Sequence, residues 1–144
     1  MKILFDTSVL VAAIVEPHPL HTPAFRWLKR ARAKEFDMLI AGHTLAELYA
    51  VLTTLPIRPK ITPGIAGHLI RSNVEALAKI VSLSPSEYSA VVKQMADLGL
   101  SGGVIYDAII VKAANKSGVD HVLTLNIDDF TRVWPEGADR LIAP

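Results

Sequence analysis

The chain has 144 residues, carries 15 lysines and arginines against 14 aspartates and glutamates, and contains no cysteine. This length suits a single domain spanning residues 1–144 with a core of its own. The absence of cysteine excludes disulfides, a thiolate zinc site and a cysteine nucleophile. A formal net charge of +1 gives no global signal for nucleic acid, so any basic contact surface has to be local. The apolar content of 51% is high for a soluble domain and indicates a surface that another chain covers.

No apolar run reaches the roughly 18 residues that a membrane-spanning helix needs. The N-terminal stretch is apolar, but Asp6 interrupts it and no small-residue cleavage site follows. The stretch therefore does not match a signal peptide. We expect a cytoplasmic protein with no membrane partner.

The first half of the chain alternates short apolar strands with helices. Prolines 17 and 19 end the first helix, and prolines 56 and 59 end the third. The apolar periodicity predicts a strand over Lys2–Phe5, a helix over Val9–Val15, a helix over His21–Lys34, a strand over Phe36–Ala41 and a helix over Thr44–Leu55.

The second half repeats this alternation. Ser84, Pro85 and Glu87 form a complete helix-start signal, with Ser at the N-cap and Glu three residues later. The predicted elements are a helix over Thr62–Ala78, a strand over Lys79–Leu83, a helix from Ser84 to about Leu98, a loop over Gly99–Gly103, a helix over Val104–Lys116, a strand over Val119–Leu125 and a short strand over Arg140–Ala143.

Short apolar strands that alternate with helices are typical of an α/β fold. We expect a three-layer α/β/α arrangement around a central, mostly parallel sheet. Ligands of such sheets bind at the carboxyl ends of the strands. Asp6 ends the first predicted strand, and Asn126, Asp128 and Asp129 follow the strand Val119–Leu125. We therefore expect the functional site at this edge of the sheet.

Three acidic residues stand alone in apolar surroundings: Asp6, Glu47 and Asp107. No Lys or Arg lies within one helical turn of any of them. A buried, unpaired carboxylate costs several kcal/mol. If the three side chains converge, a divalent cation is the natural way to neutralise them, and oxygen ligands favour Mg²⁺ or Mn²⁺.

Each acid also has a purely structural interpretation. Asp6 is placed to cap the helix that follows it, and Glu47 completes a capping box with Thr44. Asp107 lies where a helix dipole favours a negative charge. Asp128 and Asp129 fit a solvated polar turn. These interpretations explain the residues singly but not their shared placement on apolar elements that end at one sheet edge.

Four segments in order resemble the PIN-domain ribonucleases, and among them the VapC toxins of type II toxin–antitoxin systems. They are Ile3–Leu10, Thr44–Leu48, Tyr106–Ile110 and Thr124–Phe130, and together they extend over nearly the whole chain. In the family, acids at the matching positions bind the metal, which assigns that role to Asp6, Glu47 and Asp107. Many members carry a fourth acid where this chain has Asn126, and others use the acid before the Phe, here Asp129. We favour Asp129, with Asn126 as a neutral contributor and Asp128 as the remaining alternative; whether one or two metals bind stays open.

The resemblance implies a Mg²⁺- or Mn²⁺-dependent endoribonuclease that leaves a 3′-hydroxyl and a 5′-phosphate. Asp6, Glu47, Asp107 and Asp129 would be its catalytic metal ligands. Thr7, Ser8, Thr124 and Asn126 would orient these carboxylates through hydrogen bonds. The expected partners are an RNA substrate, a cognate antitoxin and a second copy of the chain in a homodimer.

The densest basic stretch includes Arg26, Lys29 and Arg30, which we interpret as an RNA-contacting edge or as an ordinary solvated helix face. Other functions remain as alternatives. One is a PIN-fold RNA-processing nuclease without an antitoxin, and another is a catalytically inactive PIN-fold binding module. A third is a phosphatase in which a phosphoryl group is transferred from the substrate to Asp6, as in the haloacid-dehalogenase-like enzymes. Such enzymes have a second Asp two residues later, where this chain has Ser8.

Overall fold

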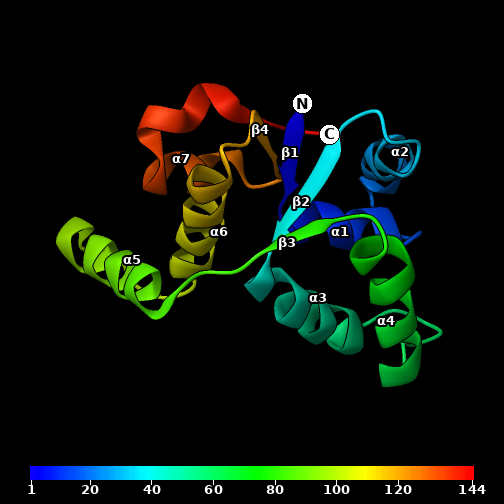
Figure 1. Ribbon diagram of the computed structural model, residues 1–144. Helices are drawn as coiled ribbons and strands as arrows, with labels where there is room; N and C mark the ends of the chain where they lie inside the picture. The colour runs from blue at the N-terminus through cyan, green and yellow to red at the C-terminus, as the bar shows by residue number, and fades with distance from the viewer.

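The protein is described by a computed structural model that includes all 144 residues. Its centre is a five-stranded sheet in the order β3-β2-β1-β4-β5, and every neighbouring pair is parallel (Figure 1). The strands are β1 (Lys2–Phe5), β2 (Asp37–Ala41), β3 (Lys79–Val81), β4 (His121–Leu123) and β5 (Leu141–Ile142). The prediction of a parallel α/β fold is confirmed.

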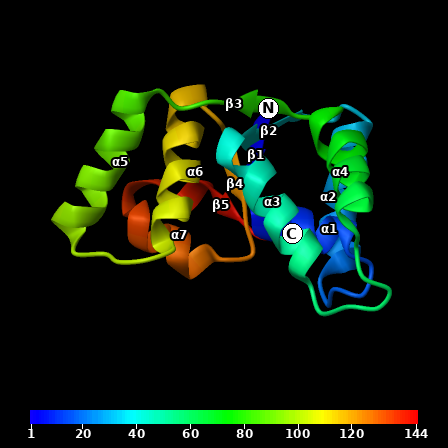
Figure 2. The same ribbon diagram turned by 90° about the horizontal axis from the view of Figure 1, so that it is seen from below.

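Helices cover both faces of the sheet. They are α1 (Thr7–Ile14), α2 (His21–Arg32), α3 (Gly42–Thr54), α4 (Pro63–Ile70) with the π-helical turn η1 (Arg71–Glu75), α5 (Pro85–Leu98), α6 (Val104–Ser117) and α7 (Ile127–Val133) with the 3₁₀ turn η2 (Pro135–Arg140). Helices α1 to α4 lie on one side of the strands, and α5 to α7 lie on the other (Figures 1 and 2). None of the helices combines the length and the apolar character needed to cross a membrane.

Each face of the sheet has its own hydrophobic core. Successive strand residues point to opposite faces, so Ile3 and Phe5 pack with α1, α2 and α3, whereas Leu4 packs with α6. Because both faces are covered, the strands need apolar residues at every position, which explains the continuous apolar runs in the sequence.

Several element boundaries differ from the prediction. The helix expected over Thr62–Ala78 changes to a π-helical turn at Arg71, and the strand expected over Val119–Leu125 is limited to His121–Leu123. Helix α7 was not predicted: Asp128 and Asp129 occupy its first turn, where we expected a polar turn. With seven residues, α7 is too short to show a helical period, although acids in its first turn and Arg132 in its last are a helix signal.

Gly137 permits the close packing of the Trp134 ring in the second core. Trp134 is 1% exposed, and a Cβ atom at position 137 would overlap its indole ring. We therefore expect Gly137→Ala to destabilise the fold by about 1–3 kcal/mol, the usual cost of overpacking. Urea unfolding followed by tryptophan fluorescence measures this change.

Gly64→Ala is the matched control for this substitution. Gly64 lies in the first turn of α4, and a Cβ atom there would meet nothing within 4 Å. We expect no loss, and a gain of up to about 1 kcal/mol, because Ala is the better helix former. Equal stability of Gly137→Ala and the parent would show that the ring is not confined as described.

Candidate metal-binding nuclease site

Asp6 marks the junction between β1 and β4. It directly follows β1, and its N–H donates to Leu123 O at 3.0 Å, which extends the pairing of the two strands by one bond. The side chain is buried in this junction, since the residue is only 3% exposed. The sheet therefore places a carboxylate with little access to water at the carboxyl ends of its two central strands.

Two hydroxyl groups hold the Asp6 carboxylate. Ser8 Oγ donates to Asp6 Oδ2 at 2.6 Å, and Thr124 Oγ1 donates to the same oxygen at 2.9 Å. Each hydroxyl also accepts a backbone N–H from the turn after β4: Ser8 from Leu125 at 3.1 Å and Thr124 from Asn126 at 2.9 Å. Asp6 occupies the N-cap position of α1 but makes no side-chain capping bond there. The carboxylate is thus tied to the β4–α7 turn instead of capping α1.

Glu47 reaches the same region from the first layer of helices. Helix α3 begins at Gly42, two residues before Thr44, so Thr44 is not its N-cap and the capping box is absent. The Thr44 hydroxyl and Glu47 Oε2 are both buried without a hydrogen-bond partner. His43 Nε2 lies 3.5 Å from Glu47 Oε2, and the His43 ring stacks on Tyr106 with 4.7 Å between centroids. Helix capping therefore does not account for Glu47.

Asp107 comes from the second layer of helices. It lies in the first turn of α6 and is partly buried. Burial, together with repulsion from Asp6, Asp129 and Glu47, raises the pKa of Asp107 to about 7. A helix dipole acting alone would lower this pKa. Its surroundings therefore oppose a negative charge at position 107.

The three acids line one cavity of about 310 Å³, which we call the acid cavity. No Lys or Arg lines it. Its walls are formed by Asp6, Thr7, Ser8, Val11, His18, Glu47, Val51, Asp107, Leu125 and Asn126. Residues separated by up to 120 positions are thus brought together, as expected from the shared sheet edge.

The acid cavity opposes the ionisation of all three acids. Burial raises the pKa of Asp6 and outweighs the hydrogen bonds from Ser8 and Thr124. Burial also raises the pKa of Glu47, repulsion from Asp6 adds to this, and His43 opposes it. With no Lys or Arg in the cavity, the folded chain leaves most of this repulsion uncompensated, and only His43 opposes it at Glu47.

The donor set of the acid cavity fits a hard divalent cation. It offers carboxylate oxygens, the Asn126 amide, and the buried Thr7 hydroxyl and Glu47 Oε2, neither of which makes a hydrogen bond within the chain. The side chains stand too far apart for three acidic or imidazole groups to reach one ion as they lie here. The chemistry of the site therefore fits a metal, although the carboxylates have to draw together around it.

Asp129 and Asp128 lie beside the acid cavity and not in its wall. Both line a neighbouring depression in the first turn of α7. Asp129 Oδ1 is 3.8 Å from Arg132 Nη1, yet its charge still raises the pKa of Asp107. Asn126, in contrast, lines both depressions. Asn126 therefore lies in the cavity wall, whereas Asp129 acts on the cavity only through its charge.

The last turn of the basic helix α2 lies near the amino ends of the strands, at the end of the sheet away from the acid cavity. Arg30 pairs with Glu35, which leads into the amino end of β2, and covers the Trp27 ring at 4.5 Å from its centroid. Lys29 lies over Phe25, and Arg26 is exposed. None of these three basic residues lines the acid cavity. Contact between them and RNA stays a prediction.

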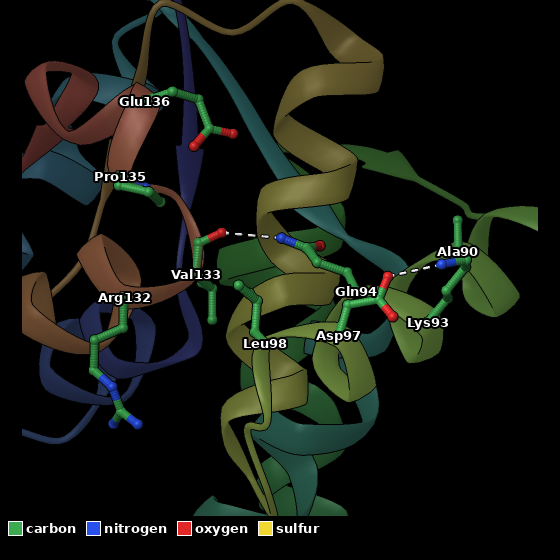
Figure 3. A pocket seen from close by; sticks show the side chains of 9 residues that line it. All are labelled: Ala90, Lys93, Gln94, Asp97, Leu98, Arg132, Val133, Pro135 and Glu136. Carbon is green, nitrogen blue, oxygen red and sulfur yellow. Dashed lines mark hydrogen bonds and ion pairs between the residues drawn. The ribbon is translucent and has the colours of Figure 1, made fainter.

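A separate pocket of about 410 Å³ lies between α5 and the segment from α7 into η2 (Figure 3). Gln94 bridges it by donating to Val133 O at 3.2 Å, and Lys93 pairs with Asp97 at its rim. None of the predicted site residues lines this pocket. It therefore belongs to the packing of α5 and not to the acidic site.

Sequence reasoning missed two histidines near the acids. His18 lines the acid cavity from the α1–α2 loop, and His43 pairs with Glu47. The spacing of His43 and Glu47, four residues apart on one helix, was a usable signal for their contact. Nothing in the sequence around His18 shows that its loop returns to the sheet edge.

Comparison with known proteins shows the family of this chain. Residues 3–134 match the model of the PIN domain. Ribonuclease VapC27 of Mycobacterium tuberculosis is 32% identical over 109 residues, which cover 76% of this chain and 74% of the relative. Ribonuclease VapC40 of the same species is 31% identical over 113 residues, which cover 78% of each chain.

Solved structures share the fold. VapC20 of M. tuberculosis, a toxin that cleaves the sarcin-ricin loop, superposes with a TM-score of 0.70 at 15% identity, covering 88% of this chain and 92% of its own. VapBC2 from Rickettsia felis, bound to a promoter DNA fragment, gives 0.62 at 21% identity over 100% and 98% of the chains. FitAcB from Neisseria gonorrhoeae gives 0.66 at 19% identity over 99% and 96%. The family match and the two curated relatives show that this chain belongs to the PIN-domain family, among the VapC ribonucleases.

Proposed function

We propose that this protein is a divalent-metal-dependent endoribonuclease that hydrolyses RNA phosphodiester bonds through the acid cavity. One observation carries the proposal. Asp6, Glu47 and Asp107 come from a strand end and from helices on opposite faces of the sheet, and they line one cavity that contains no Lys or Arg. A cluster of uncompensated carboxylates that a fold assembles from distant segments is typical of a cation site.

The proposed roles follow from the contacts. Asp6 and Asp107 would hold Mg²⁺ or Mn²⁺, and Glu47 would complete the set of ligands. A bound cation would supply a water of lowered pKa and would neutralise charge on the scissile phosphate. Ser8 and Thr124 fix the orientation of Asp6 by donating to its Oδ2. Thr7, whose buried hydroxyl has no partner, is available to orient a neighbouring carboxylate.

The fourth contributor is an acid or an amide of the β4–α7 segment. We favour Asp129, because its charge already acts on Asp107, with Asn126 as a neutral donor in the cavity wall. Asp128 has no such link to the three acids.

We further propose that the chain is the toxin of a toxin–antitoxin pair in the cytoplasm. VapBC2 of R. felis, which has the same fold, was solved on promoter DNA. This chain also exposes large apolar side chains that a partner would cover, including Tyr49, Val92 and Leu98. A short antitoxin segment that reaches the acid cavity would neutralise it best through an Arg, which pairs with carboxylates in a bidentate way.

Two other functions are outcomes of the same test. A PIN nuclease of RNA processing would cut RNA without needing an antitoxin, and an inactive binding module would not cut at all. The phosphatase alternative has no support, since Ser8 hydrogen-bonds Asp6 where that chemistry needs a second carboxylate. Sequencing of new RNA 5′ ends after brief expression of the parent and of Asp6→Asn tests the proposal. New 5′ ends that appear with the parent and not with Asp6→Asn support the ribonuclease proposal. Identical ends in cells that express either protein contradict it.

Metal binding should stabilise the fold. A cation that binds only the folded chain adds about 2.7 kcal/mol at a hundredfold excess over its Kd. Thermal unfolding with EDTA and with millimolar Mn²⁺ measures the shift, and Asp6→Asn should lose most of it. A melting temperature that does not respond to Mn²⁺ in the parent would argue against the metal site.

Asp107→Asn should separate catalysis from stability. The pKa of Asp107 is raised to about 7 in the folded chain, so its ionisation opposes folding, and the metal-free parent loses stability as the pH rises from about 4 to about 7. The amide cannot ionise. Without metal, the variant should therefore match the parent near pH 4 and exceed it near pH 8 in urea unfolding, while losing Mn²⁺ stabilisation and most RNase activity.

Asp139→Asn is the matched control for Asp107→Asn, since Asp139 is exposed and forms no ion pair. We expect it to keep the activity and the pH dependence of the parent. Asn126→Ala should lose less activity than Asp107→Asn, because it removes a neutral group. If Asp107→Asn cuts RNA at the parental rate with the parental need for metal, the proposed chemistry is wrong.

We expect the isolated chain to form a homodimer. The exposed apolar side chains give the isolated chain a reason to dimerise, most simply by two-fold symmetry. Light scattering at micromolar concentration without an antitoxin should report a dimer. A monodisperse monomer would contradict this.

A further inference from the structure

The acid cavity is poor in groups that can bind a phosphate. No Lys or Arg lines it, and the Ser8 hydroxyl already donates to Asp6. The non-bridging oxygens of an RNA phosphate carry its charge and need hydrogen-bond donors beside any cation. The side chains with N–H groups in the cavity wall are His18 and Asn126.

His18 lies in a turn closed by two backbone hydrogen bonds. It lies between Pro17 and Pro19 in the loop that joins α1 to α2, and prolines restrict the backbone on both sides. Its N–H donates to Val15 O at 3.0 Å, and its carbonyl accepts from His21 N at 3.0 Å. The ring is therefore presented to the cavity by a backbone with little freedom.

A backbone hydrogen bond determines which ring nitrogen carries the proton. The N–H of Leu20 donates to His18 Nδ1 at 3.0 Å, so Nδ1 is an acceptor and the neutral ring carries its hydrogen on Nε2. No group of the chain accepts a hydrogen bond from Nε2. In this tautomer Nε2 offers a hydrogen and no lone pair, so it suits an anionic ligand and not a metal ion.

We propose that His18 is a substrate-binding residue whose Nε2–H donates to a non-bridging phosphate oxygen of the RNA in the acid cavity. The proposal rests on the proposed ribonuclease function and adds to it the group that positions the phosphate beside the carboxylates. The bond exists in the bound substrate as well as in the transition state, so its loss raises KM more than it lowers kcat.

Two substitutions at position 18 separate binding from structure. In His18→Asn, the side-chain oxygen replaces Nδ1 as acceptor for Leu20 N–H, which is the ordinary geometry of an Asn turn, but no donor reaches the place of Nε2. In His18→Gln, the longer amide keeps a donor near that place. His68→Asn is the control, since His68 is an exposed residue of α4 away from the cavity.

We expect His18→Asn to raise KM about 10- to 100-fold, the usual value of a hydrogen bond to a charged group, with kcat little changed. His18→Gln should recover most of the loss, and His68→Asn should show none. All three variants should keep the parental melting temperature and its response to Mn²⁺. In an Asp107→Asn background, which leaves RNA uncut, adding His18→Asn should weaken binding of a fluorescein-labelled single-stranded RNA by a similar factor.

The failures of the two proposals are distinguishable. A parent protein that does not cut RNA with Mn²⁺ overturns the proposed function. An active His18→Asn variant with parental KM and RNA affinity overturns only the role of His18. Equal loss of kcat in His18→Asn and His18→Gln, with unchanged KM and a lower melting temperature, would show a structural role and also overturn this inference.

Discussion

The buried carboxylate of Asp6 at the junction of β1 and β4 is the interaction on which the rest of the site depends. A carboxylate in such a place is costly unless hydrogen bonds or a cation compensate it. The chain supplies two hydroxyls, from Ser8 and Thr124, and each of them also accepts a backbone N–H of the turn after β4. The same contacts therefore orient Asp6 and fix the turn that leads to Asn126 and α7. They compensate the charge only in part, since burial still raises the pKa of Asp6.

The layers of the fold explain how the other acids reach Asp6. Helix α3 packs on one face of the sheet and α6 on the other, so their side chains meet only beyond the ends of the strands (Figure 2). Glu47 and Asp107 approach Asp6 from these two sides. When helices cover both faces of a parallel sheet, the ends of the strands stay accessible, and ligands of such folds bind at the carboxyl ends.

The acid cavity is less stable than a core built for stability alone. Three acids repel one another, no Lys or Arg lies among them, and the pKa of Asp107 is raised to about 7. Glu47 Oε2 and the Thr7 hydroxyl are buried without hydrogen bonds, a cost that a folded protein usually avoids. Such local destabilisation is common where a site is arranged for a ligand, because the ligand supplies the missing interactions. His18 lines the same wall, and its Nδ1 is already occupied by the N–H of Leu20.

The main strands and helices and three acids of the site could be predicted from the sequence, because local patterns encode them. The apolar runs predicted the β1 and β2 strands, the Ser84 signal predicted the start of α5, and three acids isolated in apolar segments indicated a site. Local patterns do not encode the start of α3 at Gly42, which removes the capping box of Thr44 and Glu47. They encode the short helix α7 only weakly, through charges at its two ends, and packing of Phe130 and Val133 into the second core stabilises its seven residues. Only the tertiary structure brought His18 to the acid cavity and directed Arg30 to the opposite end of the sheet, because these positions depend on how loops and helices pack across the sheet and not on the residues beside them.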